Sequence, residues 1–226
     1  MWKGMYKIAG VTTVVMVVLF LFDTIMWMIL GPFPVSAEGW FKLLHDQRAV
    51  GLLLLSFPSF IGMLLYYLLF LSLYSILKQV NTAFASLAAL FAFIGLGILL
   101  LSFLAYPMVQ LSDQYAMATT ESQRTILITA GETIIADSAA NFNVGSLLVE
   151  SAAVIFSLLM LQSAVFGTTI AILGIVGHGL DLSRIIMNLA FLPEEVGAIL
   201  LMIGGLPQFI WMVLVAVKLY RLDRAS

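Results

Sequence analysis

The chain has 226 residues, of which 62% are hydrophobic and only 10% are charged, and its mean hydropathy is +1.11. A soluble domain carries roughly 25% charged residues, so this chain has too few to solvate a globular surface and must use the lipid bilayer as much of its solvent. The net charge of −2 argues against a nucleic-acid partner, and the lack of cysteine excludes thiol catalysis, disulfides and thiolate metal sites. Two histidines cannot form a three-histidine metal site, and no cofactor is expected.

Six mainly apolar runs are long enough to cross a membrane, because a spanning helix needs about 20 such residues. We therefore predict a single all-α domain over residues 1–226, a bundle of six transmembrane helices. The expected spans cover about 8–30, 49–77, 84–109, 144–165, 167–189 and 196–219. Val35-Ser36-Ala37 resembles a signal-peptidase site, but the first run is too long for a signal peptide and contains Asp23, so we expect it to be retained.

Proline and glycine mark places where two of these helices should bend. Pro58 lies in the second run, where its missing N–H should kink the helix axis. The sixth run contains Gly204, Gly205 and Pro207, which predict a break or hinge near its middle. We therefore expect hinges at both positions.

Residues 110–143 form the only long polar segment. It is not rich in Gly, Ser or Pro, so it does not resemble a flexible linker. Thr120-Glu-Ser-Gln123 fits a helix capping box, and apolar residues then recur at helical spacing. We predict short helices on the membrane surface between the third and fourth spans.

Lysine and arginine in the short flanking segments set the expected orientation. An even number of spans places both termini on one side, and the side richer in these residues should be cytoplasmic. That side holds Lys3, Lys7, Lys78, Lys218, Arg221 and Arg224, and the outer side holds Lys42, Arg48 and Arg124. The prediction is a multi-pass protein of the plasma membrane with cytoplasmic N- and C-termini.

The most informative stretch is His178-Gly-Leu-Asp181-Leu-Ser-Arg184, which lies inside an otherwise apolar run. Its three ionisable side chains are spaced three residues apart and therefore share one face of a helix. Asn188 extends this polar stripe by another turn. Charges inside a spanning helix are costly and usually point at something other than lipid, so the stripe needs partners.

Asp23 in the first run and Glu150 in the fourth are the acids available to this stripe. Both should lie roughly 10 Å below the outer ends of their helices, and the ionisable groups of the fifth span occupy similar levels. We therefore expect the first, fourth and fifth spans to be mutual neighbours, with Arg184 paired to Glu150 or Asp23. Asp181 can share Arg184 as an i, i+3 partner. Three carboxylates cannot all stay charged cheaply beside one certain cation, so one should hold a proton or a cation should bind.

Three functions fit such a cluster. The first is a buried charged pocket in the outer half of the bilayer that binds or transports a proton, an ion or a small polar molecule. The alternative is a structural or assembly subunit of a membrane complex or homo-oligomer, in which the charges form only helix–helix ion pairs. A membrane-embedded hydrolase or metal enzyme comes third and assigns no catalytic residue. Its candidate zinc ligands, which match no known metal spacing, are His45, Asp46, His178, Asp181 and Glu150.

The sixth run also carries a family-like pattern, Leu206-Pro207-Gln-Phe-Ile-Trp211 followed by Val215-Ala-Val-Lys218-Leu-Tyr-Arg221. In this pattern the chain resembles a group of uncharacterised prokaryotic membrane proteins that share a domain of unknown function. These proteins have about this length, six helices and a long polar segment after the third. The resemblance implies an architecture and assigns no catalytic residue.

Overall fold

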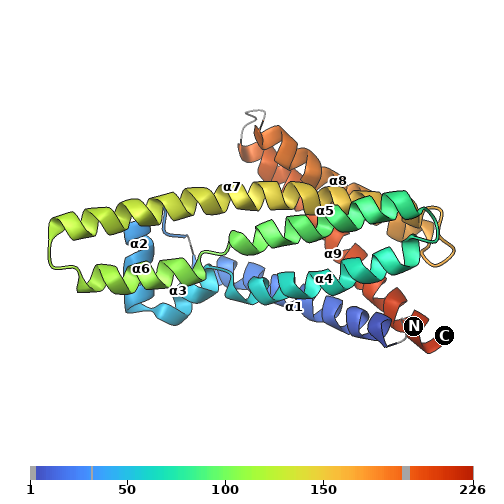
Figure 1. The fold of residues 1–226 in the computed structure, drawn as a ribbon, viewed down its shortest axis with the longest axis horizontal. Helices are drawn as coiled ribbons and strands as arrows, with labels where there is room; N and C mark the ends of the chain where they lie inside the picture. Colours follow the sequence, from blue (N-terminus) through green and yellow to red (C-terminus); the bar gives the residue numbers. More distant parts are fainter. Residues whose placement is uncertain (1–3, 32, 190–193, 226) are drawn as a thin grey trace.

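The computed structural model describes residues 4–31, 33–189 and 194–225, and within these ranges the chain is helical and forms no strand (Figure 1). The helices are α1 (Met5–Leu30), α2 (Ala37–Asp46), α3 (Arg48–Leu54), α4 (Phe57–Leu77), α5 (Thr82–Leu101), α6 (Ala105–Met117), α7 (Glu121–Met160), α8 (Thr168–Leu189) and α9 (Glu194–Ala225). Six helices of the described part are long and apolar enough to span a membrane. The predicted all-α membrane bundle is therefore confirmed.

The two ends of the bundle differ in what they carry. The start of α1 and the end of α9 lie together at one end, with the α4–α5 and α7–α8 connections, on the right of Figure 1. We call this the terminal end. The opposite end carries α2, α3, α6 and the first half of α7, which we call the lobe (Figure 1). The start of α1 and the end of α9 are therefore on the same side of the bundle, as an even number of crossings requires.

The predicted second span is two helices, because α3 ends at Leu54 and α4 begins at Phe57. Between them Ser56 has a φ of 58°, in the left-handed region that residues other than glycine rarely adopt. Pro58 lies in the first turn of α4, where a missing N–H loses no helical hydrogen bond. In place of the expected kink within one helix, the chain therefore breaks between α3 and α4, just before Pro58.

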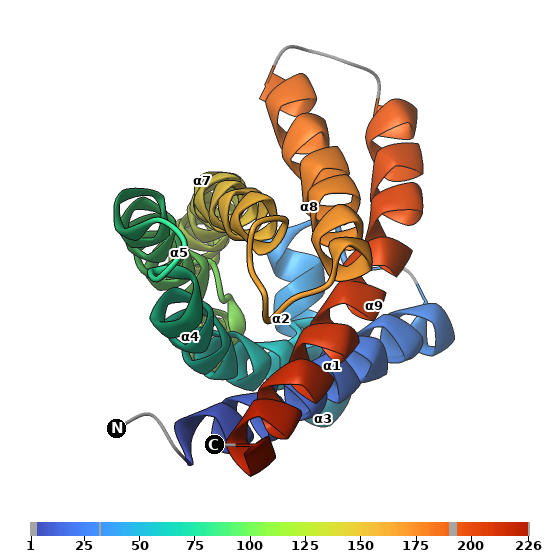
Figure 2. The same cartoon turned by 90° about the vertical axis from the view of Figure 1, so that its right-hand side faces the viewer.

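The predicted break in the sixth span does not interrupt the helix, although Figure 2 shows that the axis of α9 changes direction along its length. α9 continues as one helix through Gly204, Gly205 and Pro207. A proline inside a spanning helix is tolerated where neighbouring groups satisfy the carbonyl that it frees. Instead of being interrupted, α9 is a continuous helix whose two halves contact different neighbours.

The two halves of α9 pack against different helices. A Cβ added to Gly177 of α8 would lie 2.8 Å from the backbone nitrogen of Gln208, in the first half. A Cβ added to Gly10 of α1 would lie 2.8 Å from the carbonyl oxygen of Ala216, in the second half. Figure 2 shows α9 beside α8 at one end and crossing α1 at the other. Both contacts depend on glycine, which allows two helix backbones to approach closely.

The polar segment 110–143 is helical, but it does not form separate short helices on the membrane surface. α6 continues beyond α5 after a short break, and α7 extends for 40 residues without interruption. The capping box predicted at Thr120 and Gln123 is present at the start of α7. At 1.5 Å per residue α7 is about 60 Å long, twice the thickness of a hydrocarbon layer. The helix is therefore too long to lie wholly within one hydrocarbon layer along the membrane normal.

The lobe has its own apolar core and polar contacts. The buried hydrophobic residues of this core are Ala37, Trp40, Phe41, Leu44, Leu54, Leu55, Ala105 and Met108. Glu132 of α7 accepts a hydrogen bond of 2.7 Å from the backbone nitrogen of Ala37 and so caps the first turn of α2. Arg48 forms an ion pair with Asp113 of α6. The lobe is therefore a folded extension of the bundle.

A candidate proton site at the bundle centre

The centre of the site is a contact between Glu150 of α7 and His178 of α8. Nδ1 of His178 lies 2.7 Å from Oε2 of Glu150, and the two side chains are 0% and 12% exposed. Glu150 precedes the end of α7 at Met160 by ten residues, and His178 follows the start of α8 at Thr168 by ten. Each therefore lies about 15 Å from the terminal end of its helix, near the middle of a hydrocarbon layer about 30 Å thick.

A third helix contributes an amide to the same carboxylate. Nε2 of Gln208 in α9 donates to Oε2 of Glu150 at 3.2 Å and to the carbonyl oxygen of Gly177 at 3.3 Å. One carboxylate oxygen therefore connects α7, α8 and α9. Gln208 was not predicted from the sequence, although a lone amide in an apolar run is a visible signal.

The permanent cation of the site has its partner within its own helix. Nε of Arg184 lies 2.5 Å from Oδ1 of Asp181, and these side chains are 13% and 11% exposed. The predicted ion pair between Arg184 and Glu150 or Asp23 is not formed. An i, i+3 pair needs no particular packing between helices, and Glu150 already contacts His178. Asp181 is thus the partner of Arg184, as their position on the same face of α8 allowed.

The protonation state of His178 sets the charge of this site. Two acids and one arginine accompany the imidazole, so the group is neutral when His178 is protonated and both acids are ionised. When His178 is neutral, the site carries one negative charge unless an acid holds a proton. Asn188 also belongs to α8, but its side chain lies outside the described part of the structure.

Asp23 lies in a different place. α1 packs against α4 and α9, whereas α7 and α8 pack against each other, so the predicted mutual packing of the first, fourth and fifth spans is wrong for the first. Oδ2 of Asp23 accepts a hydrogen bond of 2.9 Å from the backbone nitrogen of Ser59. Ser59 lies in the first turn of α4, whose N–H groups have no acceptor in their own helix because the chain turns at Ser56. Asp23 therefore caps α4, where a carboxylate also complements the helix dipole.

The five candidate zinc ligands are not brought together. His45 and Asp46 belong to α2 in the lobe, whereas His178 and Asp181 belong to α8 in the bundle. Within the described ranges no three His, Asp or Glu side chains are placed to hold a metal ion. The positions of these five side chains therefore do not support a metal site built from them.

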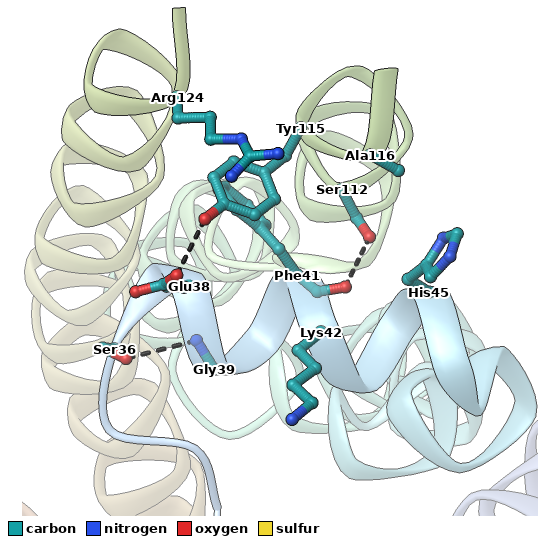
Figure 3. Close-up of a pocket in the computed structure, with 10 residues that line it drawn as sticks. All are labelled: Ser36, Glu38, Gly39, Phe41, Lys42, His45, Ser112, Tyr115, Ala116 and Arg124. Atoms are coloured by element: carbon teal, nitrogen blue, oxygen red, sulfur yellow. Dashed lines mark hydrogen bonds between the residues drawn. The ribbon is translucent and has the colours of Figure 1, made fainter. Parts of the chain in front are cut away.

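The lobe contains an open pocket that the sequence did not predict (Figure 3). Its volume is about 530 Å³, and its lining includes Glu38, Lys42 and Arg124. The hydroxyl of Tyr115 donates to Glu38 at 2.7 Å, and the Arg124 guanidinium lies over the Tyr115 ring, 5.8 Å from its centroid. Both signs of charge are exposed there, so the pocket suits a solvated polar molecule on the lobe side.

Comparison with protein-family models, with curated proteins and with solved structures found no match to this chain. The resemblance to the uncharacterised six-helix family therefore stays a prediction.

Proposed function

We propose that this membrane protein binds and exchanges a proton at Glu150 and His178, and that the exchange accompanies the binding or passage of a small polar molecule or ion. The observation that carries the proposal is the 2.7 Å contact between a carboxylate and an imidazole at the middle of the bundle.

The chemistry of the two groups supports proton exchange. In water, carboxylic acids and imidazoles change charge within a few pH units of neutrality, and imidazole is the side chain suited to switching there. In a low-dielectric interior an uncompensated charge is costly, so the position of the proton decides the charge and the strength of the contact. Since Glu150 also accepts from Gln208, gain or loss of a proton alters the attraction among three helices.

The structural alternative is supported by a different observation. Arg184 and His178 each have an acidic partner within the chain, so the charges could serve only to hold helices in place. This alternative requires a contact that keeps one protonation state. The two hypotheses therefore differ in whether His178 titrates in the folded protein.

Nitrogen NMR of histidine can decide between them, because the chain has only two histidines and His45→Gln leaves His178 alone. In lipid nanodiscs, the proposed function predicts that the ring nitrogens of His178 change reversibly between neutral and protonated forms when the pH is lowered from mildly alkaline to mildly acidic. Glu150→Gln should change this titration, and Glu132→Gln in the lobe should not. A His178 that keeps one form across the range would support the structural alternative and refute the proposal.

We also propose that the terminal end faces the cytoplasm of a cell whose plasma membrane the protein crosses. Support comes from the lysines and arginines, since Lys7, Lys78, Lys218 and Arg221 lie at that end and the lobe holds three, Lys42, Arg48 and Arg124.

The absence of cysteine makes this orientation easy to test. In intact cells, Ser122→Cys in the lobe should react with a membrane-impermeant maleimide. Asn81→Cys, in the α4–α5 turn, should react only after the membrane is permeabilised. The reverse pattern would contradict the proposed orientation.

A further inference from the structure

Three buried polar atoms close to the Glu150–His178 contact have no hydrogen-bond partner among the described residues. They are Nε2 of His178, Nε1 of Trp211 and Oγ of Ser157, and all three residues are 0% exposed. They belong to α8, α9 and α7, the same three helices that meet at Glu150. Buried polar groups in proteins are nearly always paired, and buried water is a common partner.

Gly174 brings two of these atoms together. A Cβ added to Gly174 would lie 2.5 Å from Nε1 of Trp211 and would overlap Oγ of Ser157. Both atoms therefore face the bare Cα of this glycine. His178 follows Gly174 by one helical turn, and its ring meets the Trp211 ring edge-on, with centroids 4.7 Å apart. The three polar atoms thus surround one turn of α8.

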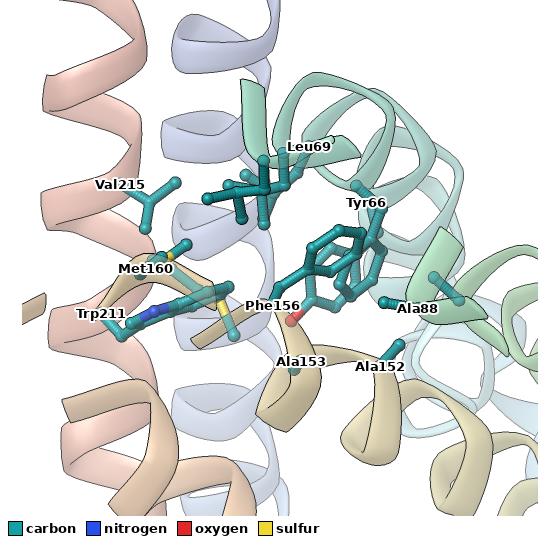
Figure 4. Packing of buried hydrophobic residues seen from close by; sticks show 14 of the residues in the cluster. Tyr66, Leu69, Ala88, Ala152, Ala153, Phe156, Met160, Trp211 and Val215 are labelled. Carbon is teal, nitrogen blue, oxygen red and sulfur yellow. The ribbon is translucent and has the colours of Figure 1, made fainter. Parts of the chain in front are cut away.

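This cluster lies on the terminal-end side of the Glu150–His178 contact. Ser157 follows Glu150 by about two turns of α7, towards Met160, and Gly174 precedes His178 in α8. Figure 4 shows Trp211 with its apolar neighbours Phe156, Met160 and Val215. Glu150 and the pair of Ser157 and Trp211 therefore lie on opposite sides of the His178 ring.

The hydrogen-bonding capacities of the three groups select the ligand. An indole N–H only donates, a serine hydroxyl donates and accepts, and imidazole Nε2 does either according to its tautomer. None of the three atoms is hydrogen-bonded to either of the others, so no group among them satisfies all three. A water molecule can satisfy them, because it accepts two hydrogen bonds and donates two.

We propose that Ser157, Trp211 and Nε2 of His178 form a water site that extends the proton site towards the terminal end. This inference rests on the proposed function. His178 receives a proton at Nδ1 from the Glu150 carboxylic acid, which becomes a carboxylate, and releases the proton of Nε2 to the water. The imidazole that remains is neutral and keeps its Nδ1–H, which donates to Glu150.

The same nitrogen NMR sample tests this inference. With His45→Gln and labelled histidine in nanodiscs, we expect magnetisation to pass from water to the Nε2 proton of His178. Ser157→Ala and Trp211→Phe should each shift the Nε2 resonance. Ser151→Ala is the matched control on α7, because its hydroxyl already donates to the Leu147 carbonyl at 2.7 Å, and it should shift nothing.

Each outcome separates the inference from the proposed function. A His178 that titrates, while its Nε2 has no contact with water and is unmoved by both variants, refutes the water site and leaves the proposed function standing. A His178 that contacts water but does not titrate refutes the proposed function and with it the transfer of a proton through His178 to the water. If Trp211→Phe does not fold, Ser157→Ala alone gives the same reading.

Discussion

Gly95→Val is expected to destabilise the bundle by about 3 kcal/mol, near the upper end of the usual cost of overpacking. A Cβ at Gly95 would lie 2.8 Å from the carbonyl oxygen of Gly145 and 2.9 Å from side-chain carbons of Leu148 and Val149. The oxygen belongs to the backbone of α7, so the clash is relieved only if α5 and α7 move apart. These two helices form the most extensive helix–helix contact among those described. The free energy of unfolding in mixed detergent and dodecyl sulfate would measure the loss.

Gly97→Val is the matched control on the same helix. The nearest atom to a Cβ at Gly97 is the hydroxyl oxygen of Tyr67 at 3.7 Å, an ordinary van der Waals distance. This variant should lose less than about 1 kcal/mol, as substitutions away from packed contacts usually do. Equal losses for Gly95→Val and Gly97→Val would show that the α5–α7 contact is not the cause.

Arg184→Ala is expected to cost about 3–5 kcal/mol, the range seen when one member of a buried ion pair is removed. The substitution leaves the carboxylate of Asp181, 11% exposed, without its cation and close to the Glu150–His178 contact. Adding Asp181→Asn to Arg184→Ala should recover most of the loss, because no unpaired charge then remains. The free energies of unfolding of the two single variants and the double variant measure the coupling.

Two further variants serve as controls for the loss expected of Arg184→Ala. Arg48→Ala breaks the ion pair with Asp113 in the lobe, where the side chains are 49% and 46% exposed, and should cost less than about 1 kcal/mol. Glu150→Gln should also cost less than Arg184→Ala, since a glutamine still bonds His178 and Gln208. Strictly additive losses for Arg184→Ala and Asp181→Asn would contradict a specific pair.

The parts of the fold that depend on local composition were predictable from the sequence. Runs of apolar residues of membrane length identified all six spans, and the hydrogen bonds of the capping box at Thr120 and Gln123 are present. Both features are properties of neighbouring residues along the chain. The lengths of α6 and α7 were not predictable in the same way, because a polar helix outside the membrane has no apolar signal to mark its continuation.

The pairing of charges was harder to predict, because it depends on how each helix is rotated about its axis. Depth alone allowed Arg184 to pair with Glu150 or Asp23, whereas the structure pairs His178 with Glu150. The role of Asp23 depends on the helix break at Ser56, where a serine in a left-handed conformation has no sequence signature. Gln208 was different, since its amide was visible in an apolar run and only its partner was unknown.

The contact of α9 with α1 has a consequence for biosynthesis. The face of α1 at Gly10 is covered by Ala216 and Tyr220, which the ribosome adds about 200 residues later, or roughly 10–40 s at ordinary elongation rates. α4 meets α1 early, and Asp23 can then cap α4. The face of α1 around Gly10 stays uncovered until α9, the last helix, is inserted. A chain truncated before α9 would therefore present to the insertion machinery and to membrane proteases a surface that the finished protein hides.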